Sequence, residues 1–298
     1  MGKRKDYTTA ATGQEPLRKK KRESRPMKVM STRMLSKYQQ EIYKKNATSS
    51  PLLRLPPELR NQIWCLVLGG NSIHVCTYGG KMLDHSICQN PGDELDTALV
   101  VTQHLRQDQK TGCYDGHGDQ YEYVGYSRRH TGCSIYPWRE HETSVPLSLA
   151  IIKSCRQIYQ EAALLPYQLN RFACIGLEDL ADFLKILVLE QARAIETITV
   201  HVRQPYATAT FKNLIGRKLK GLRTLTCFLE LGNDIDDDPH AEVMNSKWTD
   251  SILQFQGLGL SSVRVLPYDT YKTGPHFPGG KLREWAERLE SKLHGKEA

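Results

Sequence analysis

Apolar residues with a helical period follow a pair of prolines near residue 56. They recur at every fourth position, at Leu59, Ile63 and Val67. The pair Pro56-Pro57 suits the first turn of a helix, where a missing N–H group costs nothing, and Gly69-Gly70 suits the end of one. The pattern therefore predicts one amphipathic helix that ends at Leu68 and has a single apolar face.

Beyond this helix the pattern changes three times. Ser72–Tyr78 and Lys81–Cys88 flank Gly79-Gly80, which predicts a β-hairpin. Residues 107–141 are rich in Gly, Tyr, Asp and His without a sustained period, so we predict a long loop there. A single helix is predicted over residues 145–165, ended by Pro166. Its apolar positions are Leu147, Ile151, Cys155, Ile158, Ala162 and Leu165.

The C-terminal half alternates between strand and helix patterns. Strands are predicted around residues 171–175, 197–202, 225–231 and 263–265, with helices over 177–187, 211–219, 242–255 and 282–293. Helical crossovers of this length connect parallel neighbours, so these elements should form a sheet stacked against the helix at 145–165. No internal repeat is found. In the strand at 197–202, Thr197, Thr199 and His201 form a polar face that we expect at the surface.

Together these patterns predict an α/β fold of the mixed α+β kind. A helix and a β-hairpin come first, and alternating strands and helices then form a small layered sheet. Residues 50–298 are expected to form a single globular domain, preceded by a disordered tail at residues 1–49.

The positive charge of the chain is concentrated in this tail. Residues 1–49 hold 14 Lys and Arg against four Asp and Glu, a net charge of +10. The other residues hold 27 basic and 29 acidic side chains, a net charge of −2. Because the body is balanced, its composition does not favour sequence-specific DNA recognition.

Two basic clusters in the tail are separated by 12 residues. They are Lys3, Arg4, Lys5 and Arg18, Lys19, Lys20, Lys21, Arg22. This spacing is typical of a bipartite nuclear import signal, so we predict a nuclear import receptor as a partner and the nucleus as the location. The alternative is a solvated basic tail that binds nucleic acid non-specifically through its charge.

No recognisable catalytic chemistry accompanies these elements. The cysteines and histidines of residues 74–141 lack a Cys-x-x-Cys pair, so we predict no metal site, and no motif calls for a cofactor. No apolar run is long enough to span a membrane, and Met1–Lys5 has no apolar core behind it, as a secretory signal requires. The eight cysteines are irregularly spaced, so reduced thiols are expected.

Two segments of the chain resemble a group of fungal F-box-like proteins of unknown function. One is Leu53-Arg54-Leu55-Pro56-Pro57-Glu58-Leu59-Arg60-Asn61-Gln62-Ile63-Trp64, and the other is Ser154-Cys155-Arg156-Gln157-Ile158-Tyr159-Gln160-Glu161-Ala162. The second is followed by Leu165-Pro166-Tyr167 and Asn170-Arg171-Phe172. Some members are named for a Glu-x-Arg motif, which Glu58-Leu59-Arg60 matches. An F-box is a helical segment that docks on an adapter subunit of a ubiquitin ligase, and the start of this chain is similar to its first helix.

The leading interpretation is a nuclear, non-enzymatic protein-interaction module, with an F-box-like adapter role implied by the resemblance. Its candidate partner-binding residues are Leu55, Pro56, Leu59, Ile63 and Val67. The alternative for these residues is ordinary core packing. Two further alternatives stay open for the chain, a nucleic-acid-associated regulator that binds through its tail and an uncharacterised enzyme.

Overall fold

A computed structural model describes residues 36–78, 82–88, 147, 149–202, 208–231, 247–269 and 279–295. Within this part of the chain the strands form one six-stranded sheet, and the predicted α/β class is confirmed. The strand order is β2-β1-β3-β4-β5-β6, in which only the pairing of β1 with β2 is antiparallel. The strands are β1 (Ser72–Tyr78), β2 (Met82–Ile87), β3 (Arg171–Cys174), β4 (Thr197–Val202), β5 (Thr224–Leu231) and β6 (Ser262–Asp269).

The predicted β-hairpin and the predicted parallel strands are therefore both present. The turn of the hairpin at Gly79-Gly80 and the loop expected at residues 107–141 lie outside the described residues. From β3 to β6 each strand pairs with the next one in the sequence, as helical crossovers between neighbouring parallel strands require.

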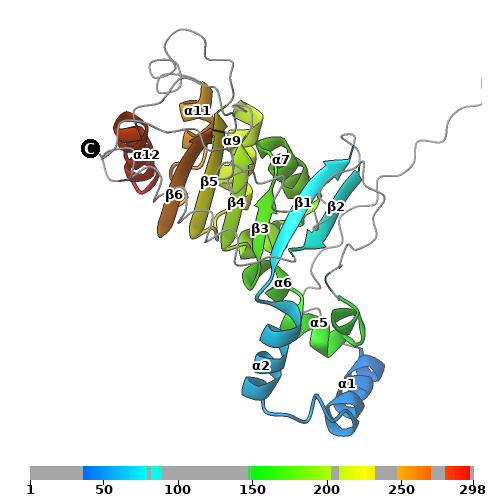
Figure 1. Ribbon diagram of the computed structural model, residues 1–298. Coiled ribbons are helices and arrows are strands. Elements are labelled where there is room, and N and C mark those ends of the chain that lie inside the picture. Colours follow the sequence, from blue (N-terminus) through cyan, green and yellow to red (C-terminus); the bar gives the residue numbers. More distant parts are fainter. Residues whose placement is uncertain are drawn as a thin grey trace, which may run out of the picture.

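Helices cover one face of this sheet (Figure 1). They are α7 (Leu177–Ile186), α8 (Leu189–Ala194), α9 (Ala209–Lys218), α11 (Lys247–Leu253) and α12 (Gly279–Leu293). Their apolar side chains pack on alternate strand residues, such as Phe172, Ile198, Leu225 and Val263, to form the main core. Each of these helices buries one side against the sheet and exposes the other, so the helical layer is amphipathic.

The strand-and-helix units repeat in register. The four residues Phe172, Ile198, Leu225 and Val263 lie side by side across the sheet. Three residues before each of them stands another apolar residue, and these are Leu169, Ile195, Leu222 and Leu260. These units begin 26, 27 and 38 residues apart, so they correspond in structure without a fixed sequence period.

The strand β4 is buried on both faces, which differs from the half-buried strand that we predicted. Thr199 and His201, expected at the surface, are each 2% exposed. The imidazole of His201 stacks on Phe228 of β5, with ring centroids 4.6 Å apart. Alternation of polar and apolar residues identified the two faces correctly, but it could not show that both are buried.

The helix predicted over residues 145–165 is broken. A 3-10 turn, η3 (Ile151–Lys153), is followed by α5 (Arg156–Ala162) and α6 (Leu165–Gln168). The break lies at Cys155, whose backbone is extended (φ −154°, ψ 162°). Pro166 lies in the first turn of α6 and does not end a helix, because a proline there displaces no hydrogen bond.

These short helices pack beside α2 (Pro57–Leu68) and do not form the layer against the sheet that we predicted, although α6 also contacts the main core through Tyr167. With α1 (Lys37–Ser49) they form a helical lobe at one end of the strands (Figure 1). Residues 37–49, which we assigned to the tail, form α1. A capping box between Ser36 and Gln39 begins this helix, although none of its residues is buried.

Candidate functional site

The helical lobe has a small core of its own, separate from the core between sheet and helices. Leu53, Trp64 and Leu68 pack against Ile152, Ile158 and Ala162. Trp64, Leu68 and Ala162 are fully buried. The lobe therefore joins two pieces of sequence that lie about one hundred residues apart, and each contributes three of these six buried residues.

The helix α2 is apolar on more of its circumference than the lobe covers. Trp64 and Leu68 on one side are buried, whereas Leu59 is 45% exposed, Val67 42% and Leu66 84%. The stripe of Leu59, Ile63 and Val67 that we predicted as the apolar face is therefore not the most buried side of the helix. Because Trp64 and Leu68 follow Ile63 and Val67 by one residue, the buried side is turned about 100° from the predicted stripe.

The predicted partner-binding residues divide between surface and core. Pro56, Leu59 and Val67 are exposed and Leu55 is half-buried. Ile63 is half-buried and packs against the lobe core. Leu66 lies beside this stripe in the sequence and is the most exposed apolar residue of α2, but it was not among the predicted partner-binding residues. The eight residues of the predicted import signal lie outside the described part of the chain.

An ion pair fixes α2 against α5. The guanidinium of Arg60 donates through Nε and Nη2 to the two carboxylate oxygens of Glu161, both at 3.0 Å. Arg60 lies in the first segment that carries the family resemblance and Glu161 in the second. A two-point contact of this kind sets the relative orientation of the two helices as well as their distance. The two segments are thus contact partners in the fold.

The lobe is joined to the sheet by Asn170 and a pair of glycines. Asn170 donates to the carbonyls of Leu68 (2.5 Å) and Pro166 (2.8 Å), and its Oδ1 accepts from the N–H of Asn71 (2.9 Å). A Cβ on Gly69 would lie 2.7 Å from the Cβ of Leu169, so only glycine allows this close approach. Gly70 adopts the left-handed conformation (φ 76°) that turns the chain into β1.

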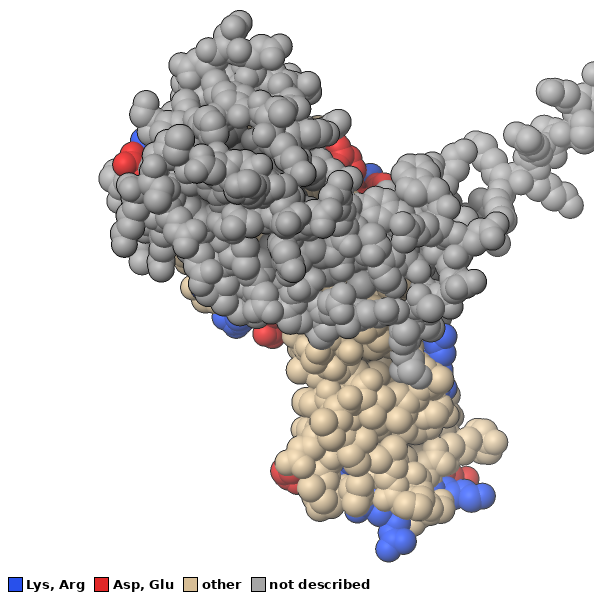
Figure 2. All heavy atoms as spheres, in the orientation of Figure 1, with Lys and Arg blue, Asp and Glu red and all other residues tan. Residues whose placement is uncertain are grey.

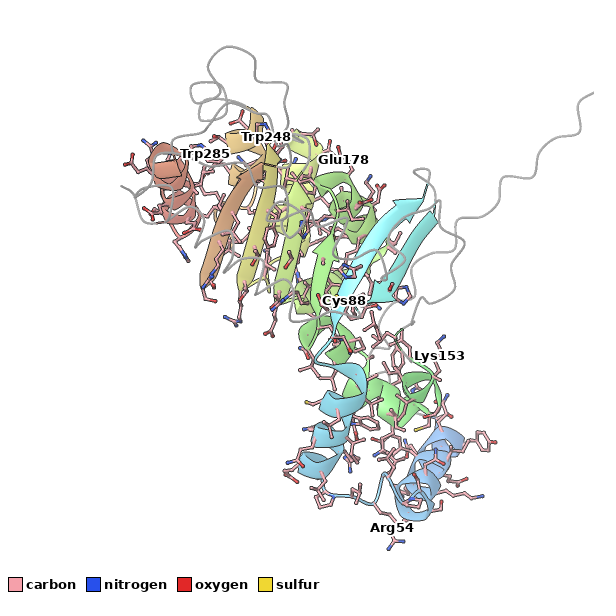
Figure 3. The ribbon with its side chains drawn as sticks, viewed as in Figure 1. Arg54, Cys88, Lys153, Glu178, Trp248 and Trp285 are labelled. Atoms are coloured by element: carbon pink, nitrogen blue, oxygen red, sulfur yellow. The ribbon has the colours of Figure 1, made fainter. Side chains whose placement is uncertain are left out.

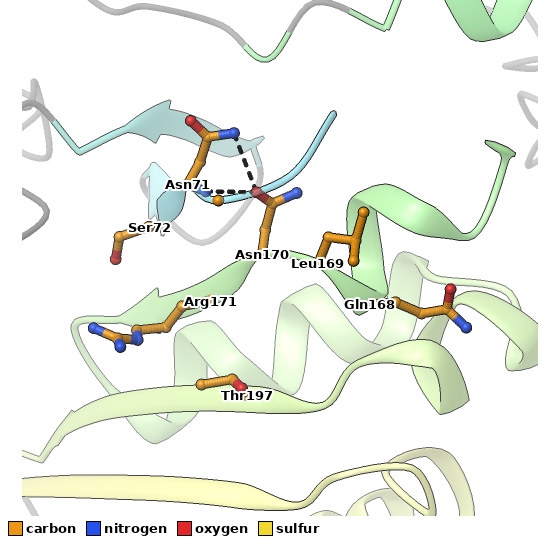
Figure 4. Close-up of a pocket in the computed structure, with 8 residues that line it drawn as sticks. Asn71, Ser72, Gln168, Leu169, Asn170, Arg171 and Thr197 are labelled. Atoms are coloured by element: carbon orange, nitrogen blue, oxygen red, sulfur yellow. Dashed lines mark hydrogen bonds between the residues drawn. The ribbon is translucent and has the colours of Figure 1, made fainter. Parts of the chain in front are cut away.

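A polar pocket of about 260 Å³ lies at this junction (Figure 4). Its lining includes Asn71, Ser72, Arg171 and Thr197, which stand at or just before the first residues of β1, β3 and β4. Ligands of open parallel sheets bind at the carboxyl ends of the strands, whereas this pocket lies at the amino ends. We therefore interpret it as a by-product of the lobe–sheet junction.

Within the described residues, no three His, Cys, Asp or Glu side chains gather closely enough to hold a metal ion. Burial, with a smaller effect of the nearby Glu290 carboxylate, raises the pKa of the Cys227 thiol to about 12, which removes its nucleophilic character at neutral pH. None of the described helices has both the length and the apolar composition that crossing a membrane requires.

Comparison with known proteins identifies one relationship. A family model described as a domain of unknown function, DUF7730, matches residues 45–218. The match spans α2, the hairpin, the lobe helices and the sheet as far as α9. No curated protein and no solved structure matches the chain.

Proposed function

The chain belongs to the DUF7730 family, a domain of unknown function, and we propose that it is a nuclear, non-enzymatic protein-interaction module. The observation that carries this proposal is the concentration of exposed large apolar side chains on the helical lobe. Six such side chains are exposed among the described residues, and five of them belong to α1 and α2. They are Tyr38, Ile42, Leu59, Leu66 and Val67. A lobe on which most of the exposed large apolar side chains are concentrated is a candidate for a protein-binding surface.

The charge distribution favours a protein partner over nucleic acid or a membrane. From Asn61 to Leu68 the helix α2 carries no charged residue. Most of the lobe surface in Figure 2 is likewise uncharged, and charged side chains gather toward its far end, where Arg54 lies in Figure 3. A phosphate backbone or an anionic lipid surface requires cations along the contact, whereas the centre of a protein interface is depleted of charge.

We further propose that the lobe has the F-box-like role that the resemblance to fungal proteins implies. The sequence lacks further helices directly after α2, but α5 and α6 supply helical neighbours from elsewhere in the chain. A helical lobe that stands at the end of a sheet domain suits an adapter, because the lobe can bind a ubiquitin-ligase subunit while the sheet domain remains accessible to another partner.

Binding of a purified ubiquitin-ligase adapter subunit to the full chain tests this role. Leu66→Asp places a charge at the most exposed apolar position of α2 and should weaken binding at least tenfold, about 1.4 kcal/mol, without lowering the thermal midpoint. Ile186→Asp is the matched control, because Ile186 is 58% exposed but lies on α7 of the sheet domain. Equal affinity of both variants, or no binding of the wild type, would refute the adapter role.

The nuclear location rests on the two basic clusters at Lys3–Lys5 and Arg18–Arg22. Alanine substitution of Lys19, Lys20 and Lys21 in a fluorescent fusion should move the protein from the nucleus to the cytoplasm. Unchanged nuclear signal would leave the clusters with only a non-specific electrostatic role.

A further inference from the structure

Among the described residues, the strand β6 pairs with β5 alone and so forms one edge of the sheet. Backbone groups of a strand point alternately to its two sides. The N–H of Ser262 donates to Arg223 on the β5 side, at 3.0 Å, so the N–H groups of Val263, Val265 and Asp269 point outward. Pro267 also occupies an outward position. An outward row of this kind is a template on which another strand can pair.

Two features interrupt that row at its centre. The N–H of Val265 donates to the Oε1 carboxylate oxygen of Glu290, at 2.7 Å, and is thereby occupied. Pro267 has no N–H group at all. An incoming strand would consequently find neither of the two central donors, although it needs both to form a regular ladder.

Glu290 is held at this edge by the packing of α12. On the same helix, Trp285, Leu289 and Leu293 are almost fully buried in the main core, and the indole of Trp285 donates to Thr249 at 3.3 Å. Figure 3 shows Trp285 on α12, beside β6. Partial burial raises the pKa of the Glu290 carboxyl, while the Val265 N–H, Arg264 and His294 act in the opposite direction and Glu287 adds to the rise.

We propose that Glu290 and Pro267 close a strand-addition site on the β6 edge that would otherwise take the β6 edge of a second copy of this chain. A second copy is the occupant because each molecule presents the same edge, and two identical strands can pair about a two-fold axis. The closure does not depend on the adapter role, since β6 and α12 lie outside the lobe. Proteins commonly protect sheet edges with a proline or an inward-pointing charge, and here both are combined.

The experiment measures the mass of the full chain in solution over a range of concentrations. Glu290→Ala removes the bond to Val265 and should shift the mass toward a dimer at concentrations where the wild type does not associate. Adding Pro267→Thr, which restores a donor, should lower the required concentration several-fold. Glu290→Gln keeps an acceptor oxygen and should behave like the wild type. Hydrogen exchange at Val263 and Val265 should slow as the alanine variant associates.

Glu290→Lys is the decisive control, since it also removes the bond but places a cation at the edge, where like charges would meet in the dimer. If the lysine and alanine variants associate equally, the association comes from displaced α12 and the proposal is wrong. It is equally wrong if the folded alanine variant associates no more than the wild type. If the alanine variant does not fold, Glu290→Ser takes its place. If neither variant folds, Glu290 is a core residue without an edge role.

Discussion

At the residue scale, Arg60 connects three parts of the helical lobe through four hydrogen bonds. Two go to Glu161 on α5, and two go from Nη1 to the carbonyls of Leu53 (3.3 Å) and Leu55 (2.5 Å) in the segment before α2. The side chains of Arg60 and Glu161 are only 12% and 25% exposed. A guanidinium that loses its carboxylate in such a place keeps its charge without compensation, which is costly.

Glu161→Gln should therefore lower the free energy of unfolding by about 2 kcal/mol, less than the loss for a fully buried pair because water reaches Glu161. Urea denaturation of the full chain measures the difference. Asp182→Asn is the matched control, since Asp182 pairs with Lys185 on the surface of α7 and should contribute less than about 1 kcal/mol. Similar losses for both substitutions would show that the pair of Arg60 and Glu161 stabilises the fold no more than a surface ion pair does.

Lys218 owes its role to contacts that a single sequence cannot reveal. Lys218 is 7% exposed and donates from Nζ to the carbonyls of Leu184 and Leu187, at 2.7 Å to the latter, where it caps the end of α7. Burial, with a smaller effect of Arg217, lowers the pKa of its ammonium group. Lys218 lies on the apolar face of α9, seven residues after Phe211 and three after Ile215, but the sequence does not show which carbonyls its ammonium group contacts.

At the element scale, the connection from α9 to β5 depends on a glycine that the backbone leaves no room to replace. A Cβ on Gly221 would lie 1.9 Å from the carbonyl oxygen of Arg193 near the end of α8. Gly216, inside α9, has no atom within 4 Å of the corresponding position. The close backbone approach therefore requires glycine at position 221, whereas no contact requires it at position 216.

The substitutions Gly216→Ala and Gly221→Ala should consequently change stability in opposite directions. Alanine at 216 should raise the free energy of unfolding by about 0.5–1 kcal/mol, because glycine is a poor helix former. Alanine at 221 should lower it by more than about 1 kcal/mol, since α8 or the turn must shift. Thermal unfolding followed by circular dichroism measures both. A neutral Gly221→Ala variant would contradict the close approach.

Elements with a strong period were predictable, and those governed by tertiary contacts were not. The hairpin, the parallel strands and the helices between them follow from alternation and turn residues. The period at 145–165 was misleading, because its apolar residues serve three short segments with an extended Cys155 between them. For α2 the sequence identified the helix but not its buried side, which the second segment of the lobe selects.

At the scale of the whole molecule, the folded unit is larger than the family match. The match ends at residue 218, whereas β4 pairs with β5 over six positions from Thr197↔Thr224 to Val202↔Leu229. Of the 31 buried residues that the structure describes in the main core, 14 come after residue 218. Local sequence patterns could not predict the helical lobe either, because its core joins segments that are distant in sequence.

A fragment limited to residues 45–218 should therefore fail to unfold cooperatively, whereas residues 45–298 should unfold in one sharp transition. Without β5, the strand β4 becomes an edge and buried side chains such as Val200 and Ile215 lose their cover, while the entropy of ordering the rest is unchanged. Omitting residues 1–44 should matter little, because α1 buries none of its side chains. Urea denaturation followed by circular dichroism compares the two fragments, which share one N-terminus and differ only in β5, β6 and their helices. A steep transition in the shorter one would mean that the matched domain is an independent folding unit to which the last two strands were added.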